Sequence, residues 1–338
     1  MCPRNISKIE LKNILIIGLS CLGDNLLITP AIKKIKDTYK NSEIDIVVGQ
    51  RAVDFVFENP WFSNYFIYNK KDGLLKLIKK LRQKKYDLIV DFRNSLIPFF
   101  LKSKYRLTFF KNELFSEKFY THESERIMNF LEPFFGKEVI KLYFPIGNNY
   151  REKIRDIFHS LGIKQSDLLV VLNPGAKFEE KRWDKEKFSI LGKELIKNYG
   201  VKIIITGSKD EEKLTEEVKE LINEDSVFNF GGKTNLKELA AIFERSDLVV
   251  TNDTGSMHLA CAVGASVVAI FGPSNPYRYG PIGARSFVVH SNIDCFPCKR
   301  ESKCKIGFKC IKEIEVDDVL KYCFIILDEK QQPQLFEI

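Results

Sequence analysis

The stretch Leu19-Ser20-Cys21-Leu22-Gly23-Asp24 follows the first apolar run of this 338-residue chain, and Asn252-Asp253-Thr254-Gly255-Ser256-Met257-His258 follows a late one. In both places an apolar run typical of a strand leads into a turn of small residues that opens a helix. The first turn of a helix presents free backbone N–H groups and a partial positive charge, which favour an anion such as a phosphate. The two stretches therefore predict two Rossmann-like halves that face one ligand.

Strand-like and helix-like runs alternate around these stretches. In the first half, we expect strands at residues 13–18, 44–48 and 88–91, with helices at 30–39 and 74–84 between them. The second series of expected strands comprises residues 168–173, 202–206, 248–252, 267–271 and 287–289. This alternation predicts parallel sheets with helices on their faces, that is, an α/β fold.

Length and composition favour two domains. Hydrophobic residues make up 44% of the chain, which is enough to bury a substantial core. The sequence Gly147-Asn148-Asn149 interrupts the alternation. We therefore expect one domain at residues 1–150, a second at 151–315, and a C-terminal helical segment at 316–338 that packs back on the first domain.

The sequence has no apolar stretch of the roughly 18 residues that a membrane-spanning helix needs. Residues 1–11 carry charges and lack the apolar core of a signal peptide. We therefore expect a cytoplasmic protein.

The positive charge of the chain is concentrated in its first half. Residues 1–150 carry 25 Lys and Arg against 16 Asp and Glu, whereas the remainder carries 28 against 29. A basic domain favours an anionic partner such as nucleic acid, a phosphorylated lipid or an acidic membrane face. Residues 92–120 are both aromatic and basic, and they either contact a lipid-like acceptor or pack as core. Because no helix-turn-helix, RRM or KH signature is present, we expect no nucleic-acid partner.

Asp24 is a candidate general base. A Walker loop would carry Lys and Ser or Thr where this chain has Asp24 and Asn25, and the turn does not match the dinucleotide pattern either. A carboxylate at the mouth of a helix can accept the proton of an attacking hydroxyl. It can equally serve only to complement the positive end of the helix. The pattern alone leaves both roles open.

Turns after the later strands offer phosphate-binding groups. Asp253 and Thr254 are N-cap candidates, and the backbone amides that follow them would point at phosphate oxygens. Lys181 either places a charge on a diphosphate or is one more surface lysine. The other candidates at the carboxyl edge of the expected sheet are Gly175, Ala176, Gly207, Ser208, Gly255 and His258.

Four cysteines cluster near the end of the second domain. Cys295, Cys298, Cys304 and Cys310 have the spacing C-x2-C-x5-C-x5-C, which matches no standard zinc finger. Four soft ligands this close together suggest a structural zinc site. Reduced structural thiols, or a disulfide that forms on oxidation, are the alternatives.

Taken together, three groups of residues resemble glycosyltransferase family 9, chiefly the lipopolysaccharide heptosyltransferases. The first group joins the strand Ile14-Leu15-Ile16-Ile17 to Ser20, Gly23-Asp24, Leu26-Leu27 and Thr29-Pro30-Ala31-Ile32. The second is Asn173-Pro174-Gly175-Ala176 with Lys181 and Trp183. The third is Asp253-Thr254-Gly255 with His258, Gly264 and Phe271-Gly272-Pro273. The resemblance covers nearly the whole chain.

The resemblance implies a GT-B architecture, in which two Rossmann-like, doubly wound domains face a central cleft. It implies inverting, metal-independent transfer of a heptose from ADP-heptose to the inner core of lipopolysaccharide. Asp24 would then be the catalytic base and Lys181 would neutralise the leaving diphosphate. Ser20 and Gly23 would form the acceptor-side turn. The donor site would comprise Gly175, Ala176, Gly207, Ser208, Asp253, Thr254, Gly255 and His258.

In this interpretation the partners are a nucleotide-sugar donor, an anionic glycolipid acceptor and the inner face of the cytoplasmic membrane. No cofactor is required, and the sequence contains no Asp-x-Asp pair of the kind that holds a divalent ion against a nucleotide diphosphate. Two positions depart from the common family pattern, because many members carry Arg where this chain has Gly18, and Pro where it has Asp184. A GT-B enzyme with another nucleotide-sugar donor and a non-catalytic nucleotide-sugar or glycolipid-binding protein are the alternative functions.

Overall fold

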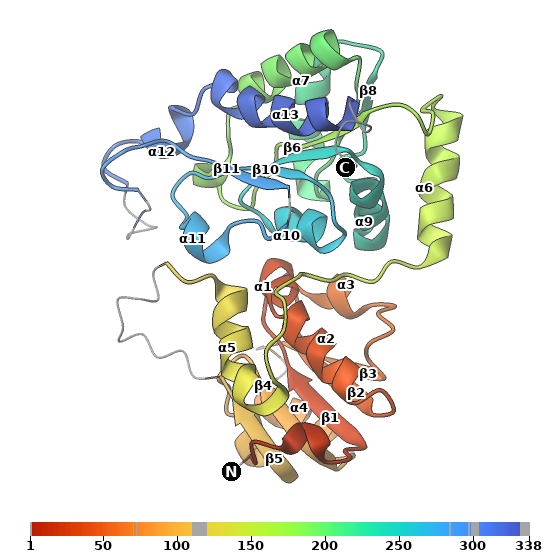
Figure 1. Ribbon diagram of the computed structural model, residues 1–338, viewed down its shortest axis with the longest axis vertical. Helices are drawn as coiled ribbons and strands as arrows, with labels where there is room; N and C mark the ends of the chain where they lie inside the picture. Colours follow the sequence, from red (N-terminus) through yellow and green to blue (C-terminus); the bar gives the residue numbers. More distant parts are fainter. Residues whose placement is uncertain are drawn as a thin grey trace, which may run out of the picture. The chain divides into compact units, whose positions relative to one another are not determined.

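The computed structural model of the protein describes residues 2–69, 71, 73–109, 120–283, 285–296, 298 and 304–331. The chain divides into two compact units, Met1–Pro145 and Ile146–Ile338. The sequence analysis placed this boundary at residue 150. In each unit, helices cover a parallel sheet (Figure 1). The expected cleft between the two units stays a prediction.

In its described part, the first unit contains a five-stranded parallel sheet with the order β3-β2-β1-β4-β5. The strands are β1 (Asn13–Ile17), β2 (Glu43–Gly49), β3 (Asn64–Tyr68), β4 (Tyr86–Asp91) and β5 (Ser103–Thr108). The central strand β1 pairs with β2 on one side and β4 on the other, and it is almost wholly buried. This is the strand order of a doubly wound sheet, as the alternation predicted.

Two strands of the first unit were missed by the sequence analysis. β3 and β5 lie at the sheet edges and leave most of their residues exposed or half-buried. Strands at an edge carry polar and charged residues, so they lack the continuous apolar run of a buried parallel strand. Lys104 and Arg106 on β5 are examples of such exposed charges. Residues 110–119 of the aromatic and basic segment lie outside the described part of the chain.

The helical elements of the first unit form two groups by their contacts. α2 contacts α5, whereas α4 contacts the 3₁₀ helix η3. The elements are η1 (Ile6–Lys8), α1 (Leu22–Leu27), α2 (Thr29–Thr38), α3 (Val53–Val56), α4 (Leu74–Leu81), η3 (Ile97–Phe100) and α5 (Glu123–Phe135). The buried face of α4 packs with residues of β1, β2 and η3 in one apolar cluster, because its apolar positions recur at helical spacing.

The described residues of the second unit form a six-stranded parallel sheet with the order β11-β10-β9-β6-β7-β8. The strands are β6 (Leu169–Asn173), β7 (Lys202–Ile205), β8 (Val227–Asn229), β9 (Leu248–Asn252), β10 (Val267–Ile270) and β11 (Ser286–Val289). All but β8 were expected. β8 is only three residues long and lies at an edge, so its sequence carries little periodicity.

The helical elements of the second unit also form two contact groups. α7 contacts α8 and α13, and α9 contacts α6 and α10. Their bounds are α6 (Asn148–Ser160), η5 (Glu179–Lys181), α7 (Lys185–Tyr199), η6 (Lys209–Glu211), α8 (Glu212–Ile222), α9 (Leu236–Arg245), α10 (Gly255–Ala262), α11 (Pro276–Tyr279), α12 (Lys309–Lys312) and α13 (Val316–Gln331). Two helix starts are stabilised by their flanking side chains. The ring centroids of Trp183 and Phe188, before and within the first turn region of α7, lie 5.1 Å apart, and Asn235 forms a capping box with Glu238 at the start of α9.

The C-terminal segment differs from its expected position. We expected residues 316–338 to pack back on the first domain, but α13 contacts α7, β9, β10 and β11 of the second unit. Its buried residues Val319, Cys323, Ile326 and Leu327 belong to the core of that unit. The apolar stripe of the helix is therefore part of the second unit. Residues 332–338 lie outside the described part.

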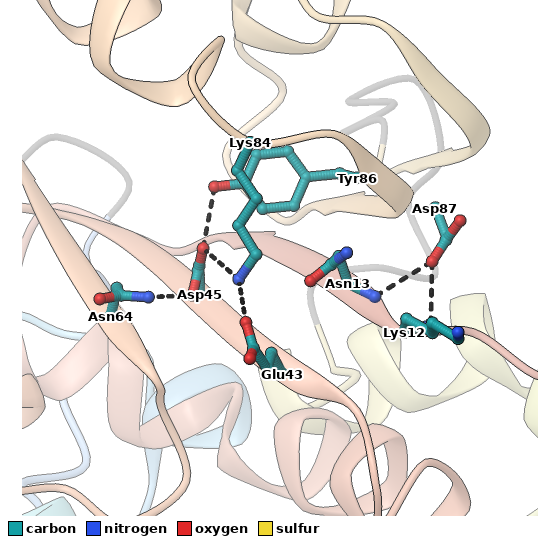
Figure 2. Close-up of polar contacts among 8 residues, drawn as sticks. All are labelled: Lys12, Asn13, Glu43, Asp45, Asn64, Lys84, Tyr86 and Asp87. Atoms are coloured by element: carbon teal, nitrogen blue, oxygen red, sulfur yellow. Dashed lines mark hydrogen bonds and ion pairs between the residues drawn. The ribbon is translucent and has the colours of Figure 1, made fainter.

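A network of polar side chains links three strands of the first sheet (Figure 2). The buried carboxylate of Asp45 on β2 accepts hydrogen bonds from Asn64 Nδ2 at 3.0 Å, Tyr86 Oη at 2.9 Å and Lys84 Nζ at 3.1 Å. Lys84 also donates to the exposed carboxylate of Glu43 at 2.7 Å. Partial burial lowers the pKa of Lys84, but hydrogen bonds and charge attraction from Glu43 and Asp45 outweigh it, so the net shift is upward. The network fastens the starts of β2, β3 and β4 to one another.

No helix in the described ranges is long and apolar enough to cross a membrane.

We expect Asp45→Asn to lower the free energy of unfolding of the first unit by about 2 kcal/mol, because an amide nitrogen would replace one of the carboxylate oxygens on which the surrounding donors converge. Hydrogen exchange of the β2 and β4 amides would measure the loss in this unit separately. The Lys84 contribution is complete below its unfolded pKa and disappears as pH rises through its raised folded pKa. The deficit of the variant should therefore shrink at alkaline pH.

Glu43→Gln is the matched control for this substitution. Its side chain is 62% exposed, so it should change the stability by less than about 0.5 kcal/mol. Equal losses in the two variants would contradict the role given to the buried carboxylate.

Candidate functional site

In the second unit, β6 and β9 lie side by side where the strand order reverses. Ligands of doubly wound sheets bind outside the carboxyl ends of the strands at such a point. Asn252, the last residue of β9, is fully buried there. Its Nδ2 donates to the carbonyl oxygens of Pro174 at 2.8 Å and Gly175 at 3.3 Å, and its Oδ1 accepts from the backbone N–H of Trp183 at 3.1 Å. One amide therefore holds the turn after β6 against the end of β9.

Lys181 and Asp253, which were predicted separately, form an ion pair at this edge. Lys181 Nζ lies 2.7 Å from Asp253 Oδ2, and the two side chains are 26% and 8% exposed. The neighbouring Arg182 donates through Nε to the carbonyl oxygen of Ala176 at 2.7 Å, which fixes the loop from the other side. An ammonium group has three donors, so two N–H groups of Lys181 are left for an anion once Asp253 is bound.

Helix α10 begins two residues after Asp253. Thr254 is its N-cap residue, and the helix begins at Gly255. The first backbone N–H groups of a helix have no partner within the helix. Thr254 Oγ1 is buried and has no hydrogen-bond partner among the described residues. His258 lies one turn into α10 and is 5% exposed. The turn therefore offers an orphaned hydroxyl and helix amides to an anion.

Two predicted glycines shape the turns after β6 and β7. A Cβ on Gly175 would lie 2.2 Å from Glu211 Cδ, and one on Gly207 would lie 2.8 Å from Thr215 Cγ2. Glu211 in turn accepts hydrogen bonds from the backbone N–H and the hydroxyl of Ser208 at 2.8 and 2.9 Å. The hydroxyl of Ser208 is thus engaged in the capping box of η6. Gly175 lies next to the Asn252 contact. The assignment of Gly207 and Ser208 to the donor stays a prediction.

In the first unit, β1 and β4 flank the corresponding reversal of strand order. The side chain of Asn25, fully buried, closes the loop that follows β1. Its Oδ1 accepts from the N–H of Leu19 at 3.0 Å, and its Nδ2 donates to the carbonyl oxygens of Leu19 at 3.0 Å and Cys21 at 2.7 Å. A Cβ on Gly18 would lie 2.6 Å from Asn25 Oδ1. The family's common Arg at this position would therefore require the amide to move.

The three predicted residues of the first unit share the turn that Asn25 closes. Ser20 precedes α1 and is partly exposed, and a Cβ on Gly49 would lie 2.8 Å from its Cα. Gly23 and Asp24 lie in the first turn of α1, where the carboxylate of Asp24 is exposed and complements the helix dipole. The hydrogen bonds of Asn25 thus hold the loop that leads into α1 and Asp24.

Arg93 is a candidate that the sequence analysis missed. The buried carboxylate of Asp91, at the end of β4, accepts from the backbone N–H groups of Arg93 at 2.9 Å and Ser95 at 2.7 Å, which fixes the turn. Burial raises the pKa of Asp91, although these hydrogen bonds oppose the shift. The Arg93 guanidinium stacks 4.8 Å from the ring centroid of Tyr68, and its Nη1 is buried without a hydrogen-bond partner in the described ranges. In the sequence, the only sign of this candidate is that a basic residue stands two positions after the end of a buried strand.

The predicted zinc cluster is not supported. The four cysteines line one cavity of about 20 Å³ together with Pro273, Phe296, Ile306 and Phe308. In the described part of the chain none of the four is joined in a disulfide; Cys295 is exposed and Cys310 is buried. Burial, with a smaller effect from the neighbouring thiols, raises the pKa of Cys310 to about 11. Among the described residues, no group of three or more His, Cys, Asp or Glu side chains is arranged to hold a metal ion.

A larger groove of about 780 Å³ lies between α6 and α9. It is lined by apolar residues such as Ile154 and Phe158, and its rim carries the two-bond ion pair between Arg151 and Glu244. Hydrogen bonding to Glu244 raises the pKa of Arg151. None of the predicted site residues lines this groove.

Comparison with known proteins adds to this geometry. The sequence profile of glycosyltransferase family 9 (heptosyltransferase) matches residues 74–307. A lipooligosaccharide heptosyltransferase 2 of Campylobacter jejuni is 29% identical over 312 residues, which cover 89% of this chain and 94% of that protein.

Two solved structures share the fold. The glycosyl transferase family 9 protein of Veillonella parvula superposes with a TM-score of 0.78 at 23% identity, covering 95% of this chain and 98% of that one. The E. coli ADP-heptose LPS heptosyltransferase II gives a TM-score of 0.76 at 20% identity, covering 95% and 100%. These likenesses confirm the predicted fold class, the GT-B type built from two Rossmann-like domains. Because the family profile spans more than two thirds of the sequence, the chain belongs to glycosyltransferase family 9 and is a glycosyltransferase.

Proposed function

We propose that this protein transfers a heptose from ADP-heptose to the inner core of lipopolysaccharide. The observation that carries the proposal is the Lys181–Asp253 ion pair, which stands beside the N-terminus of α10 where the strand order of the second sheet reverses. A cation and free helix amides side by side suit a diphosphate. The relative from C. jejuni and the E. coli structure are named heptosyltransferases, and the latter also names ADP-heptose.

We assign the donor site to the second unit. The diphosphate would receive hydrogen bonds from the amides of Gly255 and its neighbours, from the orphaned hydroxyl of Thr254 and from Lys181. Asp253 carries a negative charge and already binds Lys181, so its role is to hold the ammonium in place. The narrow turn at Gly175 and Ala176 and the buried His258 complete the set that we assign to the donor.

We assign the acceptor side to the first unit. Asp24 lies in the first turn of α1, after β1, and Arg93 lies in the turn after β4; β1 and β4 are the neighbouring strands at the reversal of order. The carboxylate would accept the proton of the attacking hydroxyl, and the unsatisfied guanidinium donor would meet an acidic group of the glycolipid. Ser20 and Gly23 form the remainder of this acceptor-side turn.

The reaction is a direct displacement with inversion. The acceptor oxygen forms a bond to the anomeric carbon while its proton passes to the Asp24 carboxylate. The bond from that carbon to the diphosphate oxygen breaks, and its electron pair leaves with ADP. Lys181 and the α10 amides stabilise the negative charge that develops on the leaving group. We propose that no metal takes part, since the chain supplies its own cation for the diphosphate.

We further propose that the protein acts at the inner face of the cytoplasmic membrane as a peripheral protein, where its glycolipid acceptor resides. An apolar acceptor anchor requires access to a bilayer, and the basic first unit suits an anionic one.

A panel of ADP-, UDP- and GDP-sugars tests the donor. We expect ADP-heptose to raise the melting temperature and to support transfer to a lipid A core acceptor. A response to a UDP- or GDP-sugar in its place would favour the alternative of a GT-B enzyme with another donor. Binding of donor and acceptor without any turnover would favour the non-catalytic alternative.

We expect Asp24→Asn to lower kcat by about 10³-fold, the contribution of a general base, while the affinity for ADP stays unchanged. Initial-rate kinetics and calorimetric ADP binding would measure the two effects. Asp54→Asn is the matched control, because Asp54 is also an exposed carboxylate in the first turn of a short helix of the same unit. Near-normal turnover in Asp24→Asn would remove this residue from the mechanism.

We expect Lys181→Gln to lower kcat by about 10²-fold through the loss of charge stabilisation on the leaving diphosphate. The control is Lys185→Gln, which removes an ion pair of similar length, 2.8 Å to Glu217, on the same unit. Kinetics and thermal melting should be compared for both variants. A large loss of thermal stability with unchanged turnover would assign Lys181 a structural role.

We expect Arg93→Gln to raise the KM for the acceptor by about 10- to 100-fold, which corresponds to one hydrogen bond to a charged group. The donor KM should not change. Arg106→Gln, an exposed arginine of β5, is the control in the same unit. The proposal for Arg93 fails if the donor KM rises in parallel with the acceptor KM.

A further inference from the structure

One surface of the first unit combines exposed apolar side chains with unpaired positive charge. It consists of the outer faces of α4 and η3, which contact each other. Its large apolar residues are Leu75, Leu96, Phe99 and Phe100, which are 79%, 63%, 70% and 42% exposed. We call these faces, with the basic residues named below, the α4–η3 surface. Exposed apolar residues that gather in this way mark an interaction site more often than scattered ones do.

The basic residues of the α4–η3 surface are exposed as well. They are Lys76, Lys79, Lys80, Arg82 and Lys102. Among the described residues none of them forms an ion pair with a carboxylate. Residues 73–86 and 92–109 contain no Asp or Glu; Asp72 precedes the first range, and Asp87 and Asp91 lie between the two. Asp87 and Asp91 accept hydrogen bonds from backbone N–H groups instead of pairing with these basic residues. The described residues of the surface therefore carry a net positive charge.

The fold holds this surface in place. Leu77, Ile78 and Leu81 on the opposite face of α4 are buried. They share one apolar cluster with Ile97 and Leu101, which flank the exposed pair Phe99 and Phe100 in the sequence. The Arg82 Nε also donates to the carbonyl oxygen of Phe100 at 3.0 Å. Leu75, Phe99 and the lysines are thus presented outward by a rigid support, and their exposure does not depend on a rearrangement.

We propose that the α4–η3 surface docks the protein on an anionic lipid bilayer. An interfacial helix binds through apolar residues at the headgroup boundary and through basic residues that meet anionic headgroups, and this surface has both. A nucleic acid would use the lysines but not Leu75 and Phe99, so the combination favours the bilayer. The inference rests on the proposed function for its biological purpose, since a docked first unit brings the acceptor-side turn to a glycolipid.

Cosedimentation with vesicles tests the proposal on the full chain. We expect binding to phosphatidylcholine vesicles that contain phosphatidylglycerol, with little binding to phosphatidylcholine alone. The variant Lys76→Gln/Lys79→Gln/Lys80→Gln should bind on the order of 100-fold more weakly, given the typical contribution of each lysine near an anionic surface. The matched control is Lys193→Gln/Lys213→Gln/Lys321→Gln, which removes the same charge from exposed positions on α7, α8 and α13.

A second variant separates the bilayer from other anionic partners. Leu75→Ser/Phe99→Ser should weaken vesicle binding at least tenfold and leave retention on heparin unchanged. If both triple variants weaken binding equally, or if the serine variant binds vesicles as well as the wild type, the proposal is wrong. A parallel loss of heparin and vesicle binding in the serine variant would also overturn it, in favour of a general polyanion site.

Activity assays distinguish this proposal from the proposed function. With a deacylated, water-soluble acceptor, the α4–η3 variants should transfer heptose at the wild-type rate, because none of these residues belongs to the catalytic machinery. Vesicle binding by a protein that transfers no heptose would refute the proposed function and leave the docking surface intact. Heptose transfer by a protein that binds no vesicles would refute the docking surface and leave the proposed function intact.

Discussion

The candidate donor site depends on one buried amide, that of Asn252. This side chain donates two hydrogen bonds to the turn after β6 and accepts one from the backbone N–H of Trp183, which ties both to the end of β9. A buried amide satisfied on both its oxygen and its nitrogen has a single low-energy orientation, because any other would leave polar groups unpaired in an apolar surrounding. Lys181 lies on the loop that this amide fixes, so the geometry of the cation follows from Asn252 and is maintained by Asp253.

The first unit uses the same device with different chemistry. Asn25 closes the loop after β1, as Asn252 closes the turn beside β9, and in each case the neighbouring strand across the reversal supplies a second loop. The loops of the first unit present a carboxylate and a guanidinium, whereas those of the second present an ammonium and helix amides. The two doubly wound frames are alike, and the side chains at their carboxyl edges differ in what they can bind.

The strands that the sequence missed all lie at sheet edges, although it predicted one edge strand, β11. Strands such as β1 and β9 have continuous apolar runs because both faces are covered, whereas β3, β5 and β8 lie at sheet edges where polar residues mask the period. The turn residues at the candidate sites were predictable because each follows a buried strand. The partnership of Lys181 with Asp253 was not, since the two are 72 positions apart and only the pairing of β6 with β9 brings their loops together. Arg93 escaped notice for a similar reason, because its setting depends on Asp91 and on Tyr68 from another strand.

The tight fit between Gly18 and Asn25 has an evolutionary consequence. A side chain at position 18 would occupy the space taken by the Asn25 amide. The present position of that amide therefore requires glycine at position 18. An arginine at position 18 would require the Asn25 amide to move, together with the hydrogen bonds that it makes. Positions 18 and 25 should therefore behave epistatically, since a larger side chain at position 18 needs a different arrangement at position 25.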